Sequence, residues 1–210
     1  MTLPTHSAIR RQLEKLAADV FAPEIALGIA SAGDISVMPE EEATLARMVP
    51  ARRREFAAGR TAARRALGQS VAIPMGPDRA PVWPAGVAGS ITHTQGWALA
   101  VVGKGMIGID LEEDEPLPTE VFGTVLLPKE RAALGADTRR AKLIFSAKEC
   151  VYKAQYPVTK ELFGFEVISI TLGDTTFHAE FQRNVGPFER GHILSGRYAI
   201  GGGFILTGIA

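Results

Sequence analysis

Two acidic residues near the middle of the chain have the spacing of a site for a hard metal ion. They are Asp110 and Glu112, in the segment Gly108-Ile109-Asp110-Leu111-Glu112. Because successive side chains of a strand point to opposite faces, the two carboxylates share one face while Ile109 and Leu111 pack on the other. Such a pair suits Mg²⁺, which takes carboxylate, water and phosphate oxygens. The alternative interpretation is a strand that runs into an acidic surface turn.

A second set of polar side chains recurs at helical spacing further along the chain. It consists of Lys142, Ser146, Glu149 and Lys153, beside an apolar helical face. This stripe could hold a carboxylate and an ammonium group against one ligand. Two alternatives compete: an exposed pair of Glu149 and Lys153, or a capping box made by Ser146 and Glu149. The capping box needs a helix start at Ser146, and the apolar period running from residue 143 to 154 argues against one.

A third segment, Gly89-Ser90-Ile91-Thr92-His93, lies between two predicted strands. Hydroxyl side chains and a histidine at a strand end could bind a phosphate, although a lone histidine is more often a hydrogen-bonded structural residue. The sequence has no G-x-S-x-G elbow, so Ser90 and His93 do not indicate a hydrolase. A Walker A motif and an H-E-x-x-H zinc motif are also absent from the sequence.

The charges of the chain balance overall but not locally. The 210 residues include 23 basic and 23 acidic side chains, so no global field indicates nucleic acid as a partner. Arginines are concentrated between residues 47 and 65, and acids between residues 110 and 115. The arginines are Arg47, Arg52, Arg53, Arg54, Arg60, Arg64 and Arg65, and the acids are Asp110, Glu112, Glu113, Asp114 and Glu115. Together they could hold a phosphorylated ligand and a divalent cation, although two solvated faces would give the same pattern.

Composition restricts the class of protein. A hydrophobic content of 46% supports one sizeable core or two small ones packed together. The single cysteine, Cys150, excludes an internal disulfide framework, and its place on an apolar helical face indicates core packing. We recognise no signal peptide and no membrane span in the sequence, and we therefore expect a globular protein of the cytoplasm.

The spacing of hydrophobic residues, together with prolines and glycines at element ends, predicts the helices and strands that position these residues. Helices are predicted over 6–20, from Pro39, over 51–67 with a stop at Gly68, from Pro128, and over 139–155. Strands are predicted over 25–30, 88–92, 97–102, 106–111, 167–172, 176–182, 192–199 and 204–209. Gly201-Gly202-Gly203 reads as a hairpin turn between the last two strands. Because the elements do not alternate regularly, the pattern favours an α+β fold over a doubly wound sheet, divided near residues 105–120.

Taken in order, these segments resemble the 4′-phosphopantetheinyl transferases of the surfactin-synthetase type, and in particular the branch that contains enterobactin synthetase component D. The resemblance covers five places between residues 52 and 153. They are Arg52-Arg53-Arg54-Glu55-Phe56-Ala57-Ala58-Gly59-Arg60, Pro81-Val82-Trp83-Pro84, Gly89-Ser90-Ile91-Thr92-His93, Gly108-Ile109-Asp110-Leu111-Glu112 and Phe145-Ser146-Ala147-Lys148-Glu149-Cys150-Val151-Tyr152-Lys153. Their order and spacing make the resemblance specific.

The resemblance implies transfer of the phosphopantetheine arm of coenzyme A to a serine of an apo acyl, peptidyl or aryl carrier protein, with release of adenosine 3′,5′-bisphosphate. It implies Mg²⁺ as the cofactor and coenzyme A as the co-substrate. It also implies two similar α/β halves, 1–108 and 109–210, with the ligand in the cleft between them. We expect a monomer without nucleic-acid partners.

The site residues follow from the same resemblance. Asp110, Glu112 and Glu149 would ligate Mg²⁺ on the pyrophosphate, Glu149 is the favoured base for the carrier serine, and Lys153 would neutralise phosphate oxygens. Thr92 and His93 would contact the 3′-phosphate of the nucleotide. Charge around the adenosine end would come from Arg52 and Arg60, and a further phosphate contact from Arg79.

Two other classes remain as alternatives at this point. One is a non-catalytic module that binds coenzyme A or a carrier protein, and the other is a Mg²⁺-dependent phosphohydrolase that uses water as the nucleophile. The presence of all three acids and of Lys153 argues against the module. A protein acceptor distinguishes the transferase from the hydrolase.

Overall fold

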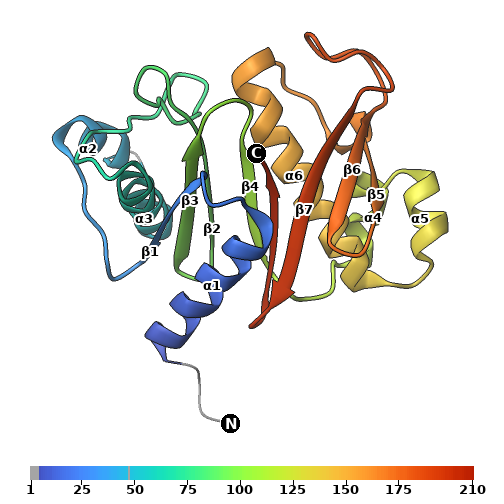
Figure 1. Cartoon of the computed structure of the whole chain (residues 1–210), viewed down its shortest axis with the longest axis horizontal. Coiled ribbons are helices and arrows are strands. Elements are labelled where there is room, and N and C mark those ends of the chain that lie inside the picture. The colour runs from blue at the N-terminus through green and yellow to red at the C-terminus, as the bar shows by residue number, and fades with distance from the viewer. Residues whose placement is uncertain (1–4, 47) are drawn as a thin grey trace.

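A computed structural model, which describes residues 5–46 and 48–210, has an α+β fold with two antiparallel sheets (Figure 1). Arg47 of the arginine cluster lies outside the described residues. The helices are α1 (His6–Val20), α2 (Pro39–Leu45), α3 (Pro50–Leu67), α4 (Phe122–Val125), α5 (Pro128–Leu134) and α6 (Thr138–Thr159). The strands are β1 (Ala26–Ser31), β2 (Ala88–Thr94), β3 (Trp97–Gly103), β4 (Gly108–Glu113), β5 (Ile168–Leu172), β6 (Thr176–Phe181), β7 (Ile193–Gly201) and β8 (Phe204–Ile209). Strand order is β1-β3-β2 in the first sheet and β4-β8-β7-β6-β5 in the second.

Each sheet packs one long helix at very short distance, and a glycine permits the approach. In the first sheet α3 lies on β1 and β3, and a Cβ on Gly28 would stand 1.9 Å from the Ala62 carbonyl oxygen. In the second sheet α6 lies on β4 and β8, and a Cβ on Gly108 would stand 2.3 Å from the Cys150 carbonyl oxygen. Contacts this short admit no side chain, so both positions require glycine.

The two long helices are tied to the short helix before them in the same way. Glu41 is the third residue of α2, and its carboxylate accepts hydrogen bonds from Met38 N (3.1 Å), Ile73 N (2.9 Å) and the Arg64 guanidinium of α3 (2.7 Å). The third residue of α5 is Glu130, whose carboxylate accepts from Leu127 N, Ile170 N and the Lys148 ammonium of α6 (2.6, 2.7 and 2.8 Å). Each acid therefore caps a short helix and pairs with a buried cation of the next helix.

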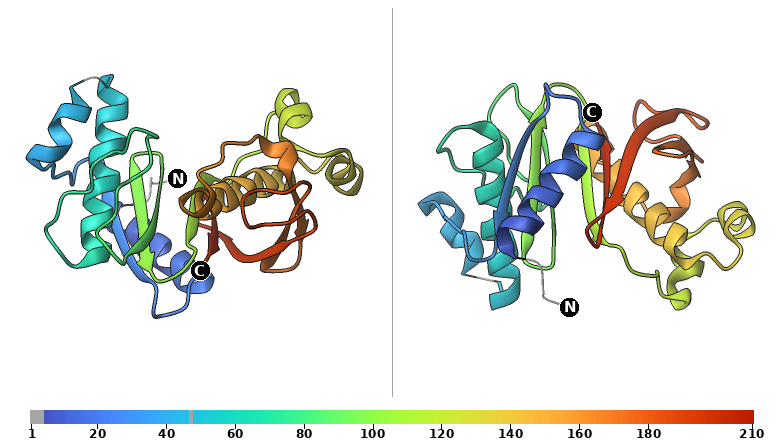
Figure 2. Two further views of the ribbon diagram at one scale, coloured as in Figure 1. Left: turned by 90° about the horizontal axis from the view of Figure 1, so that it is seen from above. Right: turned by 60° about the horizontal axis from the view of Figure 1, so that its bottom comes forward.

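The remaining helix, α1, joins the two sheets. It packs on β7 and β8 of the second sheet and on β1 of the first (Figure 2). Leu13 and Leu16 enter a core that also takes Leu99 from the first sheet and Leu206 from the second. Both sheets therefore contribute side chains to one shared core.

Most of the predicted elements are confirmed. The helix over 6–20 and the strand over 204–209 have the predicted bounds, and Gly68 ends α3 with a left-handed φ of 64°. Gly202 and Gly203, both with positive φ, form the β7–β8 turn. The prediction that ended the long helix at residue 155 was wrong: α6 continues through Pro157 to Thr159. Three short helical segments were not predicted: α4 and the 3₁₀ turns Thr119–Val121 and Phe165–Val167. Among residues 5–46 and 48–210, none of the helices has the length and hydrophobicity of a transmembrane segment.

Candidate active site

The carboxylates of β4 lie on the face of that strand that turns toward α6. Asp110 is buried with 3% of its surface exposed, and Glu112 is half-buried. Ile109 and Leu111 point the other way, into the core beneath α1. The predicted alternation along this strand is confirmed, and the acidic-surface-turn interpretation does not hold for Asp110.

Asp110 binds three side chains from two different elements. From α6, the Lys153 ammonium donates to Oδ1 at 2.6 Å and the Ser146 hydroxyl donates to Oδ2 at 2.8 Å. From β2, the Thr92 hydroxyl lies 3.4 Å from Oδ1. Hydrogen bonds and a partly buried ion pair thus hold the carboxylate in one orientation.

The polar stripe of α6 faces β4 along its length. Lys142 forms an ion pair with Glu112, at the end of the stripe opposite Lys153. Burial raises the pKa of Glu112 above its ordinary value, and the nearby Asp110 carboxylate adds to this effect. Both of the alternatives considered for the stripe, an exposed pair and a capping box, are therefore wrong, because α6 begins at Thr138 and Lys153 binds Asp110.

Glu149 lies on the same helix between Ser146 and Lys153. In the part of the chain that the structure describes, neither a hydrogen bond nor an ion pair engages its carboxylate. Burial raises the pKa of Glu149; the nearby Lys153 ammonium opposes that shift, and the carboxylates of Asp110 and Glu112 add to it. The side chain lines an opening of about 190 Å³ together with Tyr152 and Phe163. A half-buried carboxylate without a partner at such an opening is able to accept a proton or bind a cation.

Lys153 stays charged in this environment. Burial alone would lower the pKa of its ammonium group, but the ion pair with Asp110 and the proximity of Glu149 raise that pKa above its ordinary value. Within the described ranges, no group of three or more His, Cys, Asp or Glu side chains is close enough to chelate a metal ion. Lys142 and Lys153 instead balance the charges of Glu112 and Asp110.

His93 lies on the opposite face of β2 from Thr92, toward α3. The Arg52 guanidinium donates to His93 Nε2 at 2.9 Å, and a guanidinium cannot accept, so Nε2 is the unprotonated nitrogen of a neutral imidazole. Burial lowers the pKa of His93, in agreement with this state. Glu55 completes the group: its carboxylate accepts from Arg52 at 3.0 Å and lies 3.9 Å from His93 Nε2.

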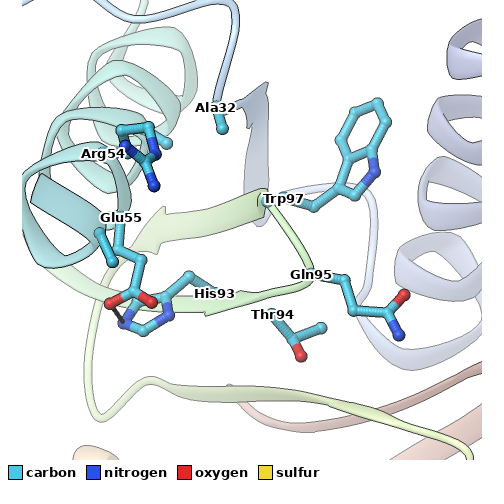
Figure 3. Close-up of a pocket in the computed structure, with 10 residues that line it drawn as sticks. Ala32, Arg54, Glu55, His93, Thr94, Gln95 and Trp97 are labelled. Carbon is cyan, nitrogen blue, oxygen red and sulfur yellow. Dashed lines mark ion pairs between the residues drawn. The ribbon is translucent and has the colours of Figure 1, made fainter.

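A pocket of about 210 Å³ opens beside His93, between the start of α3 and the β2–β3 turn (Figure 3). His93 and Glu55 lie together on one side of it, with Arg54 above them and Trp97 across the opening. Arginine and histidine side chains around an open pocket could receive an anionic group.

The two other arginines expected in the site lie in different surroundings. Arg60 of α3 is buried, with its guanidinium 4.2 Å from the centre of the Phe56 ring, and burial lowers its pKa to about 10. Its Nε has no hydrogen-bond partner among the described residues. Arg79 is exposed in the loop between α3 and β2, in a left-handed conformation with φ of 67°. The structure thus forms two groups of predicted site residues. One group contains Asp110, Glu112, Glu149 and Lys153, and the other contains Arg52 and His93. Among the described residues, neither Arg60 nor Arg79 directly contacts either group.

The hydroxyls of Ser90 and Thr92 join the two sheets where β2 meets β4. Ser90 Oγ accepts from Ile109 N at 3.2 Å, and Thr92 Oγ1 accepts from Leu111 N at 2.9 Å. Between these two strands, which belong to different sheets, side-chain hydroxyls therefore accept the hydrogen bonds that backbone carbonyls accept within a sheet. Because Thr92 also contacts Asp110, the site lies at this seam.

Sequence reasoning did not identify three further residues around the site. Lys148, adjacent to Glu149, is buried in an ion pair with Glu130. Glu55 binds Arg52, and its carboxylate lies 3.9 Å from His93 Nε2. Asp78 binds the end of α6. Only Lys148 had a signal in the sequence, since it is a charged residue on the face of α6 adjoining the apolar one.

Comparison with known families gives two adjoining matches. Residues 40–103 match the 4′-phosphopantetheinyl transferase N-terminal domain, and residues 106–201 match the 4′-phosphopantetheinyl transferase superfamily. All of the site residues listed above lie within these two ranges.

Three similar proteins are transferases or a synthase component by name. The chain is 41% identical to 4′-phosphopantetheinyl transferase Npt of Nocardia iowensis, over 84% of this chain and 90% of Npt. It is 36% identical to 4′-phosphopantetheinyl transferase PptT of Mycobacterium tuberculosis, over 83% of this chain and 86% of PptT. It is 38% identical to enterobactin synthase component D of Escherichia coli K12, over 61% of this chain and 68% of that protein.

Proposed function

Because the chain belongs to the 4′-phosphopantetheinyl transferase superfamily and transfers 4′-phosphopantetheine from coenzyme A to carrier proteins, we propose that it does so at the seam between β2 and β4. The observation that carries this proposal is the polar face of α6, which brings Ser146, Lys153 and the unpartnered Glu149 against Asp110. We propose that coenzyme A lies in a cleft along this seam, between two similar halves, 1–108 and 109–210.

Phosphoryl transfer depends mainly on positioning and on neutralising charge. In the reaction the serine oxygen of the carrier forms a bond to the β-phosphorus of coenzyme A. The bond from that phosphorus to the bridging oxygen breaks, and adenosine 3′,5′-bisphosphate leaves with the electron pair. Lys153, charged and held at Asp110, would neutralise phosphate oxygens next to the breaking bond.

Glu149 would take the serine proton, directly or through a water molecule. A serine hydroxyl is a poor nucleophile, so a base within reach speeds the transfer. Burial raises the pKa of Glu149 toward the range useful for a base, and no other side chain of the described residues holds its oxygens. Its place at an opening gives the proposed acceptor serine a path to it.

Three carboxylates have the chemistry that Mg²⁺ prefers, although the described residues hold no group of three acids close enough to chelate an ion in this structure. Asp110, Glu112 and Glu149 supply hard carboxylate oxygens, and their mutual repulsion contributes to the raised pKa of Glu112 and of Glu149. Any bound Mg²⁺ would supply positive charge to the pyrophosphate and its leaving group. These three residues would hold it, with Lys142 competing for Glu112.

The nucleotide end of coenzyme A would lie toward α3. Arg52 and His93, joined by a hydrogen bond, would contact the 3′-phosphate beside the open pocket. Arg60 would add positive charge near this phosphate from α3, and Arg79 would add it from the loop between α3 and β2. The hydroxyl of Thr92 already serves Leu111 N and Asp110, which favours a role in orienting Asp110 over the expected phosphate contact.

The similarity to named transferases favours transfer to a protein over the binding-module and phosphohydrolase alternatives. We also propose that a single copy of the chain is active. Location in the cytoplasm stays a prediction.

The test is intact-protein mass spectrometry of an apo carrier domain incubated with the protein, coenzyme A and Mg²⁺, against a control with EDTA. We expect a metal-dependent mass gain of one phosphopantetheine group. Glu149→Gln should reduce the rate by about a hundredfold or more, while the charge-matched control Glu189→Gln, on an exposed loop, should leave it unchanged. Normal transfer by Glu149→Gln would exclude it as the base, and a full gain in EDTA would exclude the metal.

A further inference from the structure

The loop that carries Arg79 is fastened to the end of the helix that carries Glu149 and Lys153. The fastening residue is Asp78, whose Oδ2 accepts hydrogen bonds from the Tyr156 hydroxyl at 3.2 Å and from the Lys160 ammonium at 3.0 Å. Asp78 lies between α3 and β2, and Tyr156 and Lys160 lie at the end of α6. The two segments lie at the same edge of the molecule (Figure 1). The Asp78 carboxylate thus connects the loop between α3 and β2, which precedes β4 in the chain, with the end of α6, which follows β4.

The same carboxylate shapes the loop. Asp78 Oδ1 accepts from Ala80 N at 3.1 Å, which closes a turn around Arg79. Gly76 and Ala80 are joined by a backbone hydrogen bond of 2.8 Å, and Arg79 N donates to Gly76 O at 2.9 Å. Arg79 is therefore held in its left-handed conformation by a turn that Asp78 both closes and anchors.

On the helix, the anchor continues the polar stripe that faces the site. Tyr156 follows Lys153 by three residues, which places both on one side of α6, and Lys160 lies directly after the helix with a left-handed φ of 55°. The Lys160 ammonium also lies 5.0 Å from the centre of the Tyr156 ring, so the two anchor groups support each other. The stripe of α6 therefore binds β4 through Lys153 and the Arg79 loop through its last turn.

We propose that Asp78 is a positioning residue that sets where Arg79 stands relative to Lys153. This inference rests on the proposed role of Arg79 as a phosphate contact. Asp78 itself touches no substrate. Its removal should therefore weaken coenzyme A binding through Arg79 and leave the chemistry at Glu149 intact.

The test is steady-state transfer to a saturating apo carrier domain, with KM for coenzyme A and kcat measured separately. Asp78→Ala should raise KM about three- to tenfold with kcat unchanged, as expected from the loss of a partly exposed, charge-assisted anchor. Arg79→Ala should raise KM at least as much. The double variant should resemble Arg79→Ala, because Asp78 acts through that arginine.

Glu161→Gln is the matched control, since Glu161 adjoins Lys160 but pairs with Arg183, and its kinetics should equal those of the parent. A raised KM for Arg79→Ala together with a parental KM for Asp78→Ala would overturn the positioning role alone. Multiplicative effects in the double variant would also overturn it. A parental KM for Arg79→Ala would refute both the phosphate contact proposed above and the inference built on it.

Discussion

Replacing Lys148 by methionine tests the buried ion pair that supports α6. The Lys148 side chain is 1% exposed, and its ammonium donates to Glu130 at 2.8 Å, to Val125 O at 2.8 Å and to Phe165 O at 3.1 Å. Methionine matches the length of the lysine stem but leaves a buried carboxylate and two carbonyls without this donor. Breaking one side of such a pair costs about 3–5 kcal/mol of unfolding free energy.

The assay is equilibrium unfolding in urea, followed by tryptophan fluorescence and by circular dichroism. At about 2–4 °C per kcal/mol for a chain of this size, Lys148→Met should also lower Tm by about 10 °C. Lys129→Met is the matched control, because Lys129 pairs with Glu180 on the surface, and it should cost less than about 1 kcal/mol. The double variant Lys148→Met/Glu130→Leu should regain part of the loss, since it no longer buries a lone charge. A loss below about 1 kcal/mol for Lys148→Met would refute this account of the pair.

Three further outcomes follow from the site and its packing. Asp110→Ala should reduce transfer by about a hundredfold or more, and near-normal turnover at limiting Mg²⁺ would contradict the metal assignment. Lys142→Met frees Glu112 for a metal ion. In a titration of Tm against Mg²⁺, the variant should reach half of its full rise in Tm at a lower Mg²⁺ concentration than the parent; an unchanged or higher concentration would show that Lys142 does not compete for Glu112. Gly108→Ala places a methyl group against the Cys150 carbonyl and should cost about 1–3 kcal/mol of unfolding free energy, so a parental urea midpoint would contradict the close packing of β4 on α6.

Local signals in the sequence predicted most of the elements, because each depends on residues close in the chain. The alternation around Asp110 and the spacing of the α6 stripe both appear in the structure. Local rules failed at Pro157, where a missing N–H usually ends a helix. The last turn of α6 continues past Pro157, and Asp78, far away in sequence, binds Tyr156 in it and Lys160 after it.

Long-range pairs were the part of the site that the sequence did not reveal. Glu130 lies 18 residues before its partner Lys148, and nothing in either local pattern links them. The hydroxyl of Thr92 bonds Leu111 N, 19 residues away, a contact that no local pattern indicated. Only the meeting of β2 with β4 makes that contact possible, and a single sequence shows neither strand order nor which strand edges adjoin.

The seam between the sheets also affects how the protein behaves toward other copies of itself. β2 and β4 are both terminal strands of their sheets, and a terminal strand normally offers free N–H and C=O groups to any passing chain. Here the hydroxyls of Ser90 and Thr92 occupy the amides of Ile109 and Leu111, so these two strands shield each other. Replacing both hydroxyl residues with alanine and valine would expose a pair of complementary edges. The seam thus guards against sheet-to-sheet aggregation in addition to forming the floor of the proposed active site.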